Sequence, residues 1–448
     1  MKPPLRIVLF ILVATVAVAL LFGQKAAREK AALLELKNDY GAEIGTIADD
    51  IIVTISGTIY DKDGNEIPNP ASKIQNLKDL RKVSRLIKRA GNAIRKEAGG
   101  GGRIEAESGV VKSVNVRATG LALMFLPGLE SLAGIENLGD LTVLTAFNCP
   151  KLKDTRGIGT LENLRDIGIV DCAALTEIDE IASIRSLENL DLSGSSSLQS
   201  VPNLSGLPDL NLLYLSRCTG LKALDVSGCA KLSQIHVENC IALQRIDGLA
   251  ETTNLKDLEA SGCHSLEHLD GLEKLAALQL LSVKNVDAID LETIGKLQNL
   301  VSLRIAGNSN LTTLAPFAAL KKLREIHIDT CENLASLQGM PPGVTQFAGF
   351  RYCPKLTTLD GLEAAAGLGD LDVGGCESLS DISAVAKLPE LLQVSFFQCP
   401  LVTDVSGLEN LEKVDFVRLG GTGVPEAGIG DLQKKMPDTI FDFSGGNN

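Results

Sequence analysis

The stretch LKDLEASGCHSL, residues 255–266, decides how this chain folds. Leu258 and Ala260 are separated by one residue, which is the spacing of two side chains on the same face of a β-strand. Cys263 follows, and from Leu266 onward leucine recurs at every third position. The same arrangement returns every 22 or 23 residues from about residue 111 to near the C-terminus, so the chain is built from one repeat.

The position of Cys263 is the anchor of each repeat. Apolar residues lie five and three positions before each anchor and three positions after it, and Pro425 is the exception. A single repeat cannot bury its own apolar face, so neighbouring repeats must stack. The fourteen anchors are Leu126, Cys149, Cys172, Ser195, Cys218, Cys240, Cys263, Val286, Asn308, Cys331, Cys353, Cys376, Cys399 and Thr422.

This pattern predicts an α/β repeat solenoid of about 14 rungs, each of which adds one strand to a parallel sheet. The strict spacing of three after the anchor favours 3₁₀ or extended turns on the outer side, because an α-helix would alternate threes and fours. Residues 221–229 place a second strand motif and Cys229 half a repeat after Cys218. We therefore expect a strand on both sides of that rung.

The motif L-x-x-L-x-L-x-x-C-x-x-L resembles the leucine-rich repeat; residues 187–198 follow it with Ser195 in place of the cysteine, and residues 255–266 follow it with Ala260 in place of one leucine. The period and the triplet spacing are similar to those of bacterial internalin-like and SDS22-like repeats. The resemblance covers residues 111–443 and implies a horseshoe with a parallel concave sheet. For function it implies only a binding surface, because this fold serves many partners.

The flanking segments differ in composition from the repeats. A strand is predicted at residues 51–55, a hairpin turn at 61–64, a first array strand at 111–116, and a terminal helix and strand at 429–443. The predicted segments are a signal anchor or signal peptide (1–23), a small helical and hairpin leader (24–98) with a basic helix (73–97), a glycine-rich hinge (99–110), the leucine-rich-repeat array (111–424), and a C-terminal cap and tail (425–448).

The N-terminus predicts contact with a membrane through residues 5–23. Lys2 and Arg6 precede the apolar run 7–22, which fits an uncleaved signal anchor, and cleavage of a signal peptide is the alternative. The short tail favours a periplasmic or extracellular body, whereas the positive charges after the run slightly favour a cytoplasmic one. The basic helix 73–97 either touches anionic lipid or is a solvated cap.

The ten cysteines occupy anchors, or in Cys229 the equivalent half-repeat position. We predict that these cysteines, together with Ser195 and Asn308, form a structural ladder of buried turn residues. Parallel side chains on stacked rungs keep Cβ atoms about 4.8 Å apart, which is longer than the 3.5–4.5 Å of a disulfide. Free thiols are therefore expected, and a linear array does not suit tetrahedral zinc.

No enzyme, metal or cofactor site is predicted. The string H-x-x-E-H at residues 264–268 matches a metalloprotease motif, but it falls on a turn of the repeat where no helix is expected. Asp61, Asp63 and Asn65 begin like a calcium loop, yet Glu66 stands where such a loop needs glycine. The net charge of −13 argues against a nucleic-acid partner.

The position four residues before each anchor should form the centre line of the concave sheet. Aromatic, imidazole and guanidinium groups on rigid strands are typical of interface hot spots, although ordinary solvated residues would also fill these positions. Two histidines in this line would make binding depend on pH between about 5.5 and 7. The candidate partner-binding residues are Tyr214, His236, Glu238, Glu259, Arg304, His327, Asp329, Arg351 and Tyr352.

Together these features predict a non-enzymatic module that binds a protein or a glycan and that is displayed from a bacterial membrane. The alternative is an SDS22-like scaffold or regulator of another enzyme that faces the cytoplasm.

Overall fold

The computed structural model describes residues 32–34, 42–47, 50–56, 58–60, 66–68, 120–136, 138–284 and 289–444. The chain divides into two compact units, Met1–Leu221 and Lys222–Asn448. The predicted segments 1–23, 73–97, 99–110 and 111–116, and the anchor Val286, lie outside the described residues. Among the residues that are described, no helix is both long and apolar enough to cross a bilayer.

The first unit contains one strand per repeat, joined in a parallel ladder. The strand predicted at residues 51–55 is confirmed as β2, which pairs in parallel with β5 through Ile52 and Gly120. The leader thus supplies the strand beside the first repeat. The strands of this sheet are β1 (Ala42–Ile47), β2 (Asp50–Ser56), β5 (Gly120–Met124), β6 (Val143–Phe147), β7 (Asp166–Val170), β8 (Asn189–Asp191) and β9 (Leu212–Tyr214). The β1–β2 pair is antiparallel, and the pairs from β2 onward are parallel.

Two further features belong to the first unit. A small antiparallel pair, β3 (Thr58–Tyr60) and β4 (Glu66–Pro68), flanks the predicted hairpin turn, whose own residues lie outside the described ranges. The segments after the anchors include two 3₁₀ helices, η1 (Ile158–Thr160) and η2 (Asp179–Ser183). The predicted 3₁₀ character of this side of the repeats is confirmed.

The second unit continues the same plan with a parallel ladder in which each strand pairs with the next. The predicted terminal helix and strand are confirmed as α4 (Glu426–Lys435) and β21. The strands are β11 (Gln234–His236), β13 (Asp257–Ala260), β14 (Leu280–Lys284), β15 (Ser302–Ala306), β16 (Glu325–Asp329), β17 (Phe347–Arg351), β18 (Asp370–Gly374), β19 (Gln393–Ser395), β20 (Phe416–Arg418) and β21 (Ile440–Asp442).

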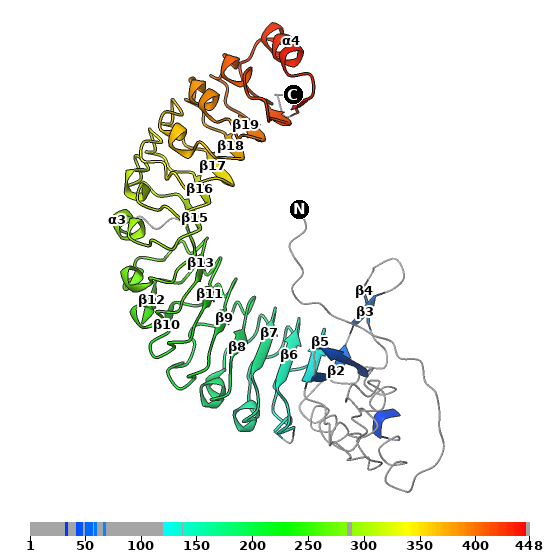
Figure 1. Cartoon of the computed structure of the whole chain (residues 1–448). Coiled ribbons are helices and arrows are strands. Elements are labelled where there is room, and N and C mark those ends of the chain that lie inside the picture. The colour runs from blue at the N-terminus through cyan, green and yellow to red at the C-terminus, as the bar shows by residue number, and fades with distance from the viewer. Residues whose placement is uncertain are drawn as a thin grey trace, which may run out of the picture. The chain divides into compact units, whose positions relative to one another are not determined.

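Short helices line the side of the second unit opposite the strands (Figure 1). The predicted second strand is also present, because β10 (Ala223–Asp225) pairs in parallel with β12 (Arg245–Asp247) in a sheet of their own. The helices of this side are η3 (Leu249–Glu251), η4 (Leu272–Lys274), α3 (Leu291–Gly295), η5 (Ala315–Phe317), η6 (Leu362–Ala365), η7 (Ser383–Lys387) and η8 (Ser406–Leu408).

The core is made by the apolar positions of the repeat. Every apolar residue five or three positions before an anchor, or three positions after it, is buried, and the exception Pro425 is exposed. Burying a leucine side chain contributes about 2 kcal/mol, so a ladder of such positions holds the stacked repeats together. The repeat assignment made from the sequence is therefore confirmed.

Each strand ends in one left-handed residue immediately before the anchor. In the described residues this position always has positive φ, whether it holds glycine, as at Gly375 (φ 65°), or a larger residue, as at Thr330 (φ 50°). Its N–H donates to a carbonyl of the next repeat, for example from Thr330 to Arg351 over 2.8 Å. The sequence analysis did not identify this position, although asparagine, aspartate and glycine recur there, which are the residues that tolerate a left-handed backbone.

The cysteines are all buried and free, as expected. Most anchor thiols lie close to a backbone carbonyl oxygen of the previous repeat. This carbonyl belongs to the residue three positions before the anchor of that repeat. Cys263 Sγ lies 3.0 Å from the carbonyl oxygen of Val237, and Cys218 Sγ lies 3.2 Å from that of Leu192. Ser195 Oγ makes the equivalent contact with Ile169 at 3.5 Å. The anchor is therefore a small buried donor, a role that cysteine and serine share.

Candidate binding surface

The predicted centre line is a line of directly paired residues in the second unit. The register places His236 opposite Glu259, then Ser282, Arg304, His327, Gly349, Asp372, Ser395 and Arg418 on successive strands. We call the outward-facing side chains of β11 and β13–β21, with the residues that follow each of these strands, the strand surface. It carries every predicted partner-binding residue except Tyr214, which lies on β9 of the first unit.

Acidic groups surround His236 at one end of the strand surface. The imidazole Nε2 lies 3.2 Å from Asp257 Oδ2, and both side chains are about a quarter exposed or less. Burial opposes protonation of His236, but the hydrogen bond to Asp257 and the charges of Asp257, Glu238 and Glu259 outweigh it and raise the histidine pKa. Burial also raises the pKa of Glu259, and the neighbouring carboxylates add to that rise.

Two cations follow on the next strands. Lys284 on β14 and Arg304 on β15 are both exposed. In the described part of the chain, neither forms an ion pair within 4.0 Å, whereas Arg351 and Arg418 of the same surface do. Nothing in that part of the chain neutralises their charges by direct contact.

The side chains of His327 and Phe347 form a stacked pair beside Arg304. Their ring centroids are 4.5 Å apart and the planes are inclined by 20°. Gly349 makes room for the phenyl ring, since a Cβ there would lie 2.7 Å from Phe347 Cε1. Burial and the charge of Arg304 lower the pKa of His327 to about 4, with a further contribution from Arg351. The expectation that both histidines titrate near neutral pH is therefore wrong for His327.

An ion pair joins the next two strands. Arg351 Nε donates to Asp372 Oδ2 over 3.0 Å, and Nη2 of the same guanidinium donates to that oxygen as well. Burial raises the pKa of the neighbouring Asp329, although the charge of Arg351 opposes this effect. Tyr352 has a left-handed backbone and 54% of its surface exposed, and its ring lies over Gly375, where a Cβ would be 2.4 Å from the ring.

Several residues that shape the strand surface were not among the candidate partner-binding residues. Phe347 and Asp372 hold His327 and Arg351 in place, and neither was named as a site residue. Arg418 packs over the ring of Phe397 with 4.0 Å from guanidinium carbon to ring centroid, and its Nε lies 3.1 Å from Asp442 Oδ2. Their positions in the repeat could have indicated four of these residues, because they face outward two, four or six residues before an anchor. The four residues are Phe347, Asp372, Phe397 and Arg418.

The first unit carries a different surface. Tyr214 pairs in register with Asp191, whose pKa burial raises. Arg217 Nη2 lies 3.0 Å from Asp171 Oδ1. Towards the N-terminus the outward positions become apolar, and the rings of Phe125 and Phe147 meet edge to face with centroids 5.3 Å apart. This unit therefore offers fewer charged groups than the strand surface.

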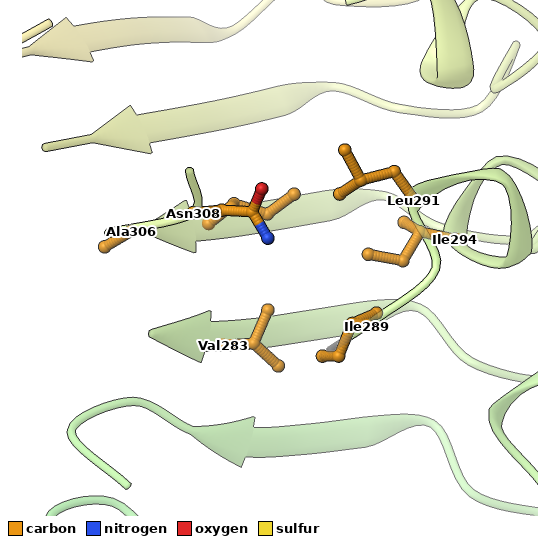
Figure 2. Close-up of a pocket in the computed structure, with 7 residues that line it drawn as sticks. Val283, Ile289, Leu291, Ile294, Ala306 and Asn308 are labelled. Atoms are coloured by element: carbon orange, nitrogen blue, oxygen red, sulfur yellow. The ribbon is translucent and has the colours of Figure 1, made fainter. Parts of the chain in front are cut away.

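A small packing gap interrupts the core of the second unit between β14, β15 and α3. Figure 2 shows the apolar side chains and Asn308 around it. The space between these side chains is too narrow to hold a water molecule. Asn308 Oδ1 accepts from the N–H groups of Asn310 and Leu311 at 3.0 and 2.9 Å, so this anchor closes its own turn.

The two histidines of the H-x-x-E-H string lie on a turn of the repeat. His264 and His268 are exposed on a turn segment with no helix, as expected from the repeat. His268 instead lines an open hollow of about 310 Å³ between η4 and α3, with Asp270, Glu273 and Asp290. Within the described ranges, no group of three or more His, Cys, Asp or Glu residues is placed to hold a metal ion.

Comparison with known proteins finds similar curated proteins and similar solved structures. No protein-family model matches the chain. A putative adenylate cyclase regulatory protein of Trypanosoma equiperdum is 28% identical over 203 residues, which span 44% of this chain and 30% of that protein. The match therefore covers less than a third of the relative's length.

The solved structures similar to this chain include leucine-rich-repeat proteins of two bacteria. The functional domain of InlJ from Listeria monocytogenes, described as including a cysteine ladder, has a TM-score of 0.51 and 18% identity over 66% of this chain and 61% of that one. A leucine-rich-repeat protein of Leptospira interrogans has a TM-score of 0.47 and 18% identity, covering 72% of this chain and 90% of its own. With the buried repeat positions and the parallel ladders, the first likeness leads to one conclusion: the chain has the leucine-rich-repeat fold.

Proposed function

We propose that this chain is a non-enzymatic interaction module that binds a protein partner through the strand surface of its second unit. The observation that carries the proposal is the pairing of Arg304 with His327, which stacks on Phe347, and the exposed Tyr352 just after β17 of the same surface. Arginine and tyrosine are enriched among residues that dominate binding energy, and here they project from paired strands. The stacked rings of His327 and Phe347 hold each other in place, so they lose little conformational entropy when a partner binds.

The opposite side of the second unit is a weaker candidate. Its cations, such as Lys274 on η4 and Lys296 after α3, are exposed lysines on short turns. Flexible lysines are depleted at interface centres, and their ordering costs entropy. These two residues therefore serve as matched controls.

A photo-crosslinking experiment tests the surface. The full chain carries benzoylphenylalanine in place of Ser395 on the strand surface, or in place of Lys274 or Lys296 on the helix side, and is irradiated in cells. We expect a discrete adduct from position 395 that Arg304→Ala and His327→Ala weaken. Adducts confined to positions 274 and 296 would move the binding site off the strand surface and refute the proposal.

We further propose that residues 5–23 anchor the chain in a membrane and place the repeats outside the cytoplasm. The support is the apolar run 7–22 after a short basic tail. A second candidate is a cytoplasmic regulator of another enzyme, which the relative described as a putative adenylate cyclase regulatory protein favours.

A topology assay separates the two candidates. Alkaline phosphatase is fused after Asn448 and its activity is measured in intact bacterial cells, with a cytoplasmic reporter at the same position as the control. Phosphatase activity supports display outside the cytoplasm. An inactive phosphatase together with an active cytoplasmic reporter would favour the regulator.

A further inference from the structure

We propose that Lys284, Arg304 and His327 form a subsite that receives a carboxylate side chain of the protein partner. The inference rests on the proposed interaction function, and it adds the chemistry of the group that is recognised. Its starting point is the difference between these cations and the other arginines of the strand surface.

The other arginines already have partners. Arg351 donates to Asp372, and Arg418 lies between the Phe397 ring and Asp442. Arg304 is exposed on β15 and, among the described residues, makes no ion pair within 4.0 Å, and the same holds for Lys284 on β14. A guanidinium in this state can form a bidentate pair with an incoming carboxylate, which is stronger than a bond to a neutral group.

The position of Arg304 also places a neutral donor beside it. Arg304 pairs directly with His327 in the β15–β16 register, and the stacked Phe347 holds the imidazole in place. Burial and the nearby Arg304 and Arg351 charges keep this imidazole neutral, so it retains one N–H donor at physiological pH. Asp329 lies two residues further along β16, where the charges of Arg351, Lys284 and Arg304 all reach it. Asp372 also acts on Asp329 and is already paired with Arg351, so Lys284 and Arg304 are the cations here whose charge an incoming carboxylate can meet.

The surroundings explain why the subsite would be selective. On the β11 and β13 side, Glu238, Asp257 and Glu259 repel an acidic group, and Glu259 is itself crowded by its neighbours. A carboxylate of the partner is therefore favoured opposite β14–β16 and disfavoured opposite β11–β13, which fixes the register of the partner.

The test uses three soluble peptides of identical Gly/Ser framework that carry three central Glu, Gln or Lys residues. Each is titrated into the full chain at low salt, and binding is followed by NMR of the imidazoles, of which the chain has four. We expect the Glu peptide alone to bind saturably and to raise the pKa of His327, because its charge offsets that of Arg304. Arg304→Glu should weaken this binding by about tenfold or more, whereas the matched reversal Lys274→Glu should leave it within about twofold.

The outcomes separate this inference from the proposed function. Equal binding of the Glu peptide to Arg304→Glu and to the native chain overturns the subsite, as does preferred binding of the Gln or Lys peptide. If no peptide binds while position 395 still crosslinks to a partner, the carboxylate subsite is wrong and the interaction function stands. If crosslinking moves to positions 274 and 296, the proposed function itself fails.

Discussion

The imidazole of His327 lies against the phenyl ring of Phe347, with 4.5 Å between centroids and 20° between planes. The two residues come from neighbouring strands, one on the centre line and one at the start of its strand. This stacking, with the nearby guanidinium of Arg304, turns a residue that could titrate near neutral pH into one that stays neutral there.

The first prediction concerns acid stability. Because burial lowers the pKa of His327 from 6.5 to about 4, the unfolded chain binds a proton at a higher pH than the folded chain does. The stability contributed by the neutral imidazole is fully present above pH 6.5 and is lost as the pH falls towards 4. His327 is half-buried, so after allowance for solvent screening this loss is about 1–2 kcal/mol. The free energy of unfolding is measured with denaturant at pH 7 and at pH 4.5. Between these two pH values, His327→Gln should lose less stability than the native chain. An unchanged difference between the two pH values would contradict the assignment.

The second prediction concerns His236, whose pKa shifts in the opposite direction. The contact with Asp257 favours the imidazolium, so this stabilisation is fully present below the unfolded pKa of 6.5 and is lost as the pH rises through the raised folded value. Asp257→Asn should lower the pKa of His236 in an NMR titration. An unchanged pKa of His236 in this variant would show that the Asp257 carboxylate does not stabilise the protonated imidazole.

The fold could be predicted from the sequence because each repeat has the same spacing of apolar residues. Two apolar residues one position apart define a strand face, and a fixed spacing then places equivalent residues opposite each other on successive strands. The line from His236 to Arg418 follows from this spacing alone. The left-handed position before the anchor could have been found from residues such as Asn148, Gly194 and Asn239, which share a preference that other residues at that position obscure.

The side-chain partners could not be predicted in the same way. The contact of Arg351 with Asp372, or of Arg418 with Phe397, joins residues 21 positions apart and depends on side-chain rotamers, which the spacing does not determine. The prediction that His327 titrates near neutral pH was wrong for the same reason. A histidine on an outward-facing position was expected to be solvated, but Phe347 and Arg304 provide a partly buried and positively charged environment.

The third prediction concerns the thiols. Burial raises the pKa of Cys218, Cys263 and Cys399 to about 12, so these anchors carry almost no thiolate at neutral pH. Without reductant, a thiol reagent at pH 8 should detect few groups in the native chain and all ten after denaturation. Cross-linked peptides that join Cys331 to Cys353, or Cys376 to Cys399, would instead identify disulfides.

The last prediction exploits the left-handed position that ends each strand. Thr330 has φ of 50° and is exposed, and a β-branched residue is poorly suited to that conformation. Thr330→Gly should relieve about 1 kcal/mol of strain, reduced by the greater entropy that glycine gives the unfolded chain. Gly375→Ala is the reverse test, because φ is 65° there and a Cβ would collide with the Tyr352 ring. It should lower stability by about 1–2 kcal/mol. Thermal unfolding of the two variants should therefore shift in opposite directions, the first upward by a few degrees at most. A downward shift of Thr330→Gly that matches that of Gly375→Ala would show that the threonine side chain stabilises the turn more than its backbone strains it.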